Sequence, residues 1–123
     1  MSFHLSGENI RVRGAILKAQ LRNMGGELVD AEINLDEFIG NNDGNFEWGG
    51  ENFSQSAENI SFSIEGGGEV PVLRADLRDC EGNYHHRDIN LSERVENIDG
   101  RFEFLHWVYR NVRLGLLLSI QYQ

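Results

Sequence analysis

The sequence contains very little cysteine, proline or positive charge, and each shortage excludes a class of protein. One cysteine, Cys80, cannot form an internal disulfide, which fits a reducing compartment. The single proline, Pro71, lies where an expected strand begins, and no proline-rich linker divides the chain. Lys and Arg total 11 against 20 Asp and Glu, so the formal net charge is -9 and the basic residues are scattered. This acidic balance argues against a nucleic-acid partner.

Long apolar runs are lacking too. The N-terminal segment MSFHLSGENIR has no basic start followed by an apolar stretch, so no secretory signal peptide is predicted. The apolar segment 114–120 is far shorter than the roughly 20 residues that a membrane-spanning helix needs. We therefore expect a cytoplasmic protein with no membrane partner.

What the chain does contain is an internal duplication. Residues 17–48 align without a gap on residues 73–104, with 14 identities in 32 positions. The lead-ins SGENI (6–10) and SAENI (56–60) also match, and the second copy has extra residues around Gly66 that we interpret as a loop. Because 123 residues are too few for two independent cores, the duplication predicts one small β-rich domain.

Each copy alternates apolar and polar residues with the period of a half-buried strand. Residues 15–22 do so, and residues 29–35 do so again after Gly26, which predicts two antiparallel strands joined by a glycine turn. Residues 73–77 repeat the first strand, and residues 84–91 repeat the second less regularly.

Beyond these strands, each copy has a cap and a tight turn. Two pairs have the spacing of a capping box and predict a short helical turn: Asn34 with Glu37, and Asn90 with Glu93. Each helical turn ends at an Asn-x-Asp-Gly sequence, in which Asp-Gly supplies the positive φ of a tight turn before a short aromatic strand. The residue pattern therefore predicts a unit of strand, strand, helical turn and strand.

Sites for metals, nucleotides and catalysis are not predicted. Placing Gly44 or Gly100 at the sixth position of a calcium loop puts Ile39 or Val95 at its first ligand position. The adjacent histidines 85 and 86 point to opposite faces of a strand and cannot share a metal. The glycine runs lack the Gly-Lys-Ser/Thr of a phosphate loop, and nothing singles out a catalytic pair among the carboxylates. We expect no cofactor and no enzymatic activity.

The repeated Asn-x-Asp-Gly turn leaves two interpretations open. Asn and Asp on a rigid turn offer donors and acceptors in fixed positions, as a neutral polyhydroxyl ligand such as a carbohydrate requires. The same residues are also common in turns for purely structural reasons.

The segments INLDEFIGNNDGNFEWGGENF and INLSERVENIDGRFEF resemble the cyanovirin-N homologue family of lectins, in particular its fungal members, over about Phe3 to Leu105. The resemblance implies a mainly β fold of two pseudo-symmetric halves, each a three-stranded sheet plus a hairpin with short helical turns, with strands exchanged between the repeats. It implies one domain over residues 1–107, with repeats of about 2–53 and 54–107, and leaves residues 108–123 as a tail without an assigned role.

The resemblance also implies non-catalytic binding of mannose-type oligosaccharides or glycoproteins, in particular high-mannose glycans with α1-2 linkages. The residues that it implies for a first site are Ser2, Ser6, Arg22, Met24, Asn97, Ile98 and Asp99. Those for a second site are Asn41, Asp43, Glu51, Asn52, Gln55, Ser56, Arg78 and Asp79, with Gly40 where the family has a glutamate.

Three further expectations accompany the resemblance. The positions of the founding member's disulfides are Gly7 with Leu21 and Ala57 with Leu77, so both bridges are absent here. Exchange of halves between two chains would use Gly49-Gly50 as a hinge, and because glycine lets the chain fold back we expect a monomer. The alternatives are an interaction module that keeps the fold without sugar binding and, less expected, a glycan-acting enzyme.

Overall fold

The computed structural model describes residues 2–106, so the predicted tail at 108–123 lies outside the described residues. The elements of the first repeat are α1 (Phe3–Ser6), β1 (Glu8–Arg13), β2 (Ile16–Arg22), β3 (Leu28–Asn34), the 3-10 turn η1 (Leu35–Glu37), β4 (Ile39–Asn42) and β5 (Asn45–Trp48). Those of the second repeat are the 3-10 turn η2 (Phe53–Ser56), β6 (Ala57–Glu65), β7 (Val70–Arg78), β8 (Tyr84–Asn90), the 3-10 turn η3 (Leu91–Glu93), β9 (Val95–Ile98) and β10 (Arg101–Phe104).

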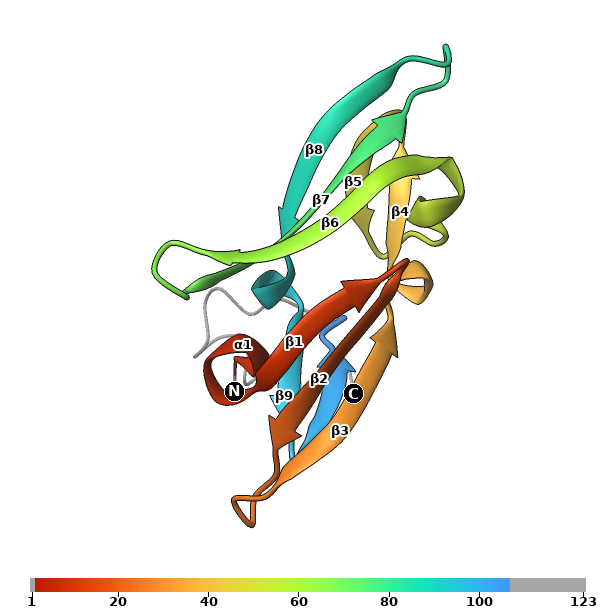
Figure 1. The fold of residues 1–123 in the computed structure, drawn as a ribbon. Helices are drawn as coiled ribbons and strands as arrows, with labels where there is room; N and C mark the ends of the chain where they lie inside the picture. Colours follow the sequence, from red (N-terminus) through yellow and green to blue (C-terminus); the bar gives the residue numbers. More distant parts are fainter. Residues whose placement is uncertain (1, 107–123) are drawn as a thin grey trace, which may run out of the picture.

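The strands form two antiparallel three-stranded sheets and two hairpins. One sheet has the order β1-β2-β3 and the other β6-β7-β8, while β4 pairs with β5 and β9 pairs with β10. Each hairpin lies against the sheet of the other repeat, because β5 contacts β8 and β10 contacts β3 (Figure 1). The predicted fold of two halves with exchanged strands is confirmed.

The core forms where the alternating positions of the two central strands meet. Leu17, Ala19 and Leu21 of β2 are buried, as are Leu73, Ala75 and Leu77 of β7. Leu21 and Leu77 are fully buried at positions that carry cysteines in the founding member, so apolar packing replaces the crosslinks there. The free thiol of Cys80 is exposed.

The predicted helical turns are present, with half of each capping box. Asn34 Oδ1 accepts the N–H of Asp36 at 3.0 Å, and Asn90 Oδ1 accepts that of Ser92 at 3.0 Å. The other half of a capping box is a hydrogen bond from the glutamate back to the cap residue, and this prediction is wrong at Glu93. Its Oε1 instead accepts a hydrogen bond from Trp48 Nε1 at 3.1 Å. This bond ties the hairpin of the first repeat to the second repeat.

The residue pattern predicted too few strands. It missed β1 and β6, whose alternation is interrupted by bulges at Asn9 (φ 59°) and Asn59 (φ 56°). It also assigned the short strands β4 and β9 to the end of a helical turn, since four residues carry too little periodicity to identify a strand.

Candidate functional site

The two Asn-x-Asp-Gly turns lie at opposite ends of the molecule (Figure 1). Each lies beside the second loop of a sheet from the other repeat, the β2–β3 loop at one end and the β7–β8 loop at the other. Asp43 (φ 51°) and Gly44 (φ 87°) connect β4 to β5, and Asp99 (φ 53°) and Gly100 (φ 82°) connect β9 to β10. Two successive positive φ values are typical of the type I′ turn that matches the twist of a hairpin. The predicted tight turns are therefore confirmed. We call the end at Asp99 the first end and that at Asp43 the second end.

At the first end, Asn97 connects the hairpin to the other repeat. Its side chain is only 4% exposed. The amide nitrogen donates to Ser6 Oγ at 3.2 Å and to the carbonyl of Arg22 at 3.0 Å, and Oδ1 accepts the N–H of Gly100 at 2.9 Å. Both amide protons are thus used within the protein, and Asn97 fixes the position of the turn.

The second end repeats this arrangement through the duplication. Asn41 donates to Ser56 Oγ at 2.7 Å and to the carbonyl of Arg78 at 2.8 Å, and its Oδ1 accepts the N–H of Gly44 at 2.8 Å. The two asparagines are therefore equivalent in role as well as in sequence.

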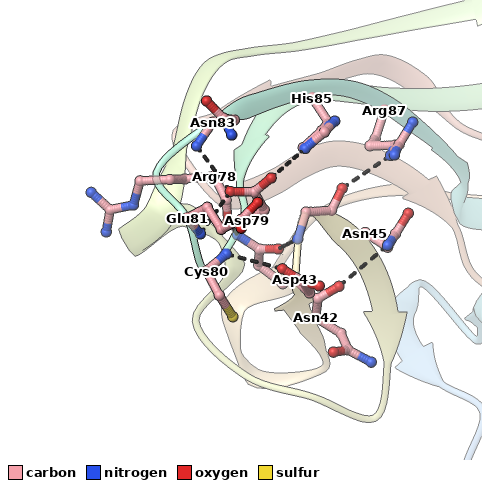
Figure 2. A network of polar contacts seen from close by, with 12 residues as sticks. Asn42, Asp43, Asn45, Arg78, Asp79, Cys80, Glu81, Asn83, His85 and Arg87 are labelled. Atoms are coloured by element: carbon pink, nitrogen blue, oxygen red, sulfur yellow. Dashed lines mark hydrogen bonds and ion pairs between the residues drawn. The ribbon is translucent and has the colours of Figure 1, made fainter.

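Each of the aspartates that follow accepts a backbone N–H from the neighbouring loop. Asp99 Oδ1 accepts the N–H of Met24 at 2.9 Å, and Asp43 Oδ1 accepts that of Cys80 at 2.9 Å (Figure 2). Within residues 2–106 the second oxygen of Asp99 has no hydrogen-bond partner, whereas the Cys80 thiol hydrogen-bonds the Asp43 carboxylate, which raises the pKa of the thiol. Both aspartates are exposed. The first end thus presents a fixed carboxylate with an available acceptor, whereas the carboxylate at the second end is also engaged by the Cys80 thiol.

A cavity of about 360 Å³ opens at the first end. Its lining residues are Ser6, Arg22, Asn23, Met24, Asn97, Ile98 and Asp99. The structure thus brings together every residue predicted for the first site except Ser2, which lies next to it and pairs with Glu96 on β9. Asn23 was not among the predicted residues, although the repeat aligns it with Asp79 of the second site.

Polar contacts shape the loop at the second end (Figure 2). Asp79 Oδ1 accepts the N–H groups of Glu81 and Asn83, each at 2.9 Å, and Oδ2 lies 2.6 Å from His85 Nε2. The hydrogen bond with His85, followed by that from the Asn83 N–H, lowers the pKa of Asp79 from its ordinary 3.8. Asp79 is therefore committed to holding its loop, as Asn23 is at the first end, where Asn23 Oδ1 accepts the N–H of Glu27 at 2.9 Å.

His85 and Arg87 also belong to the second end, and the sequence analysis did not assign them there. Arg87 Nε donates to the carbonyl of Gly44 at 3.0 Å. His86, the neighbour of His85, faces the other way and lies 2.8 Å from Asp76, as its strand position predicts.

The remaining residues predicted for the second site lie on the connection between the repeats and on η2 at the start of the second repeat. Glu51, Asn52 and Gln55 are exposed, and Asn52 bridges to Gly40. Gly40, where the resemblance places a glutamate of the family, packs closely against the backbone of the connection between the repeats. A Cβ atom at Gly40 would lie 3.0 Å from the Cα of Gly50 and 3.0 Å from the backbone nitrogen of Glu51, so the connection between the repeats would have to shift slightly to admit a side chain.

Within residues 2–106, no group of three or more His, Cys, Asp or Glu side chains is placed to hold a metal ion. No helix in that part of the chain is long and apolar enough to cross a membrane.

Comparison with known proteins identifies the family. The model of the CVNH domain matches residues 3–103. The chain belongs to the CVNH domain family. A relative from Neurospora crassa described as a cyanovirin-N homolog is 52% identical over 108 residues, which cover 84% of this chain and 97% of the relative. A cyanovirin-N homolog from Tuber borchii is 36% identical over 91 residues, covering 74% of this chain and 84% of the relative.

Solved structures show the same fold at high identity. A designed cyanovirin-N homolog lectin is 48% identical, with a TM-score of 0.79 over 85% of this chain and 99% of its own. The CVNH of Gibberella zeae is also 48% identical, with a TM-score of 0.78 over 84% of this chain and 96% of its own.

Proposed function

We propose that this CVNH domain is a non-catalytic lectin that binds mannose-type oligosaccharides, in particular those with α1-2 linkages, and that the first end is its main site. The observation that carries the proposal is the Asp99 carboxylate, held by the Met24 N–H at the wall of a 360 Å³ cavity with its other oxygen available. A fixed acceptor beside a cavity suits the paired hydroxyls of a sugar. The likeness to a designed cyanovirin-N homolog lectin supports the same class of ligand.

The residues of the first end divide into two roles under this proposal. Asp99 and Ser6 contact sugar hydroxyls, while Asn97 positions the turn because both of its amide protons are already used. Arg22 is held by its own loop, since Nη1 donates to the carbonyl of Gly26 at 2.8 Å. Asn97, which the resemblance implies for the first site, therefore acts under this proposal by positioning the turn and not by contacting the sugar.

The second end is a weaker site of the same kind. It keeps the hydrogen bonds of Asn41 and Asp43, but the Cys80 thiol also hydrogen-bonds the Asp43 carboxylate, and His85 contacts Asp79. Because each hydroxyl contact contributes only about 1 kcal/mol net, small sugars bind weakly to one end, and a branched glycan that reaches both ends binds more tightly.

A glycan array comparing the wild-type protein with Asp99→Asn and Asp43→Asn tests this function. Asparagine tolerates positive φ and keeps one oxygen for the Met24 or Cys80 N–H, so both variants fold but lose the second carboxylate oxygen. We expect oligomannose binding to fall at least tenfold in Asp99→Asn and less in Asp43→Asn. A folded wild-type protein that binds no glycan would instead be an interaction module, and cleaved oligomannose would indicate an enzyme.

A further inference from the structure

Two exposed apolar side chains lie together in the lining of the cavity at the first end. Met24 is 88% exposed and Ile98 is 42% exposed, and both line the cavity. The backbone of Met24 is fixed because its N–H donates to Asp99, so its thioether chain starts from a defined point beside the available carboxylate. An apolar surface next to a polar anchor is typical of a ligand site rather than of ordinary surface.

The other repeat shows that the scaffold does not require these two side chains. The repeat alignment places Cys80 opposite Met24 and Asn42 opposite Ile98. The same hydrogen bond from a backbone N–H to a carboxylate oxygen is present at both ends. The distance is 2.9 Å from the Met24 nitrogen to Asp99 Oδ1 and 2.9 Å from the Cys80 nitrogen to Asp43 Oδ1. Asn42 uses its amide to donate to Glu47 Oε1 at 3.0 Å, a bond that isoleucine cannot make. The two ends thus share their anchor and differ in the chemistry beside it.

We propose that the first end prefers sugars that carry a methyl group next to the hydroxyls bound by Asp99, with Met24 and Ile98 packing on that methyl. This inference rests on the proposed lectin function and specifies the ligand class of the same site. A 6-deoxy group, an N-acetyl group and an O-methyl group supply the same chemistry. A thioether and a branched alkyl chain cannot hydrogen-bond a hydroxyl efficiently, but they cover a methyl group well.

The expected preference is about fourfold for one methyl group. Burying one methyl-sized group contributes a free energy that corresponds to a factor of about four in Kd. The second end, with Cys80 and Asn42, lacks the apolar pair and should show no such preference.

Residue-resolved NMR titration tests this proposal, because the amides of Met24 and Cys80 report on the two ends separately. The parent ligand is α1-2-linked mannobiose. Three methyl-bearing analogues, called its partners, are compared with it: one has a 6-deoxy terminal residue, one a 2-acetamido terminal residue, and one an O-methyl group at the reducing end. Comparing the three Kd values shows at which position of the sugar a methyl group is preferred. We expect at least one partner to bind the first end about fourfold more tightly than the parent.

For each variant we compare the ratio of two dissociation constants at the first end, that of the parent divided by that of the methyl-bearing partner. In the double variant Met24→Gln/Ile98→Asn, glutamine keeps the length of the Met24 side chain, and asparagine is the residue that the second end has at the equivalent position, Asn42. We expect the ratio of parent Kd to methylated Kd to fall to about one in this variant. In Leu5→Gln, which removes an exposed apolar side chain outside the cavity lining, the ratio should stay at about four.

Two results would overturn the inference while leaving the lectin function in place. One is a ratio near one for all three partners in the wild-type protein, and the other is a ratio that the double variant does not change. Absence of binding by the parent and by every partner would overturn the proposed function together with the inference.

Discussion

At the scale of single residues, the two asparagines of the repeated turn show how far a motif can be interpreted. The spacing Asn-x-Asp-Gly could be found in the sequence, and it led to the correct turns. It could not show that Asn97 points inward, because β9 is too short for its faces to be distinguished by periodicity. The burial of Asn97 and its three hydrogen bonds to the protein reveal its positioning role.

Replacing Asn97 by alanine should lower the free energy of unfolding by about 1–3 kcal/mol, because the Gly100 N–H and the Arg22 carbonyl lose their partner. Urea denaturation measures the loss. Asn42→Ala is the control, since Asn42 is exposed and should cost little. Equal unfolding midpoints for Asn97→Ala and the wild-type protein would show that these bonds contribute nothing.

Glu65 gives a pH-dependent prediction. Its hydrogen bonds with Arg74 and then Ser63 lower its pKa from 4.5 to about 2. Because the folded protein favours the charged form, this contribution to stability is complete above pH 4.5 and is lost as the pH falls toward 2. Between pH 4.5 and 2, the free energy of unfolding should therefore fall less steeply with decreasing pH in Glu65→Gln than in the wild-type protein. Both side chains are partly exposed, so the effect is small, and parallel curves would contradict it.

At the scale of elements, the strands that could be predicted are those with one buried face. β2 and β7 alternate cleanly and were found, whereas the bulges at Asn9 and Asn59 interrupt the pattern in β1 and β6. The three-stranded sheets followed only from the family resemblance. The connection that covers Gly40 could not be predicted, since it is a contact between backbone segments with no side-chain pattern.

Gly40→Ala tests that contact. The added methyl would lie 3.0 Å from the backbone nitrogen of Glu51 and 3.0 Å from the Cα of Gly50, so the connection between the repeats must shift. We expect a loss of about 1–3 kcal/mol in unfolding free energy, as overpacking typically costs. Gly25→Ala is the matched control, because its added methyl meets only ordinary contacts and its φ is not positive. If the two variants unfold at the same urea concentration, the tight packing at Gly40 is not a constraint.

At the scale of the whole molecule, neither half is complete without the other. Each sheet is covered by the hairpin of the opposite repeat, and Phe46 of one hairpin packs on Phe53 of the second repeat with ring centroids 5.6 Å apart. The length of the chain predicted a single core, but only the resemblance implied that the repeats exchange strands. The monomeric state and cytoplasmic location remain predictions, which size-exclusion chromatography and localisation of the tagged protein can check.

The interlaced halves should unfold together. Hydrogen exchange at the core amides of Leu21 in one sheet and Leu77 in the other should give the same opening free energy, because loss of either sheet uncovers a hairpin from its partner. Phe46→Ala should lower both values equally. Two separate opening free energies would show that the repeats behave as independent units.

We expect the cavity at Asp99 to bind a mannose-type oligosaccharide. The most direct test of this binding is an NMR titration of the wild-type protein with α1-2-linked mannobiose, followed at the backbone amides. We predict saturable shifts that are largest at Met24, Ile98, Asp99 and Gly100, with smaller shifts around Asp43. Unchanged spectra, or shifts confined to residues away from both turns, would contradict the account.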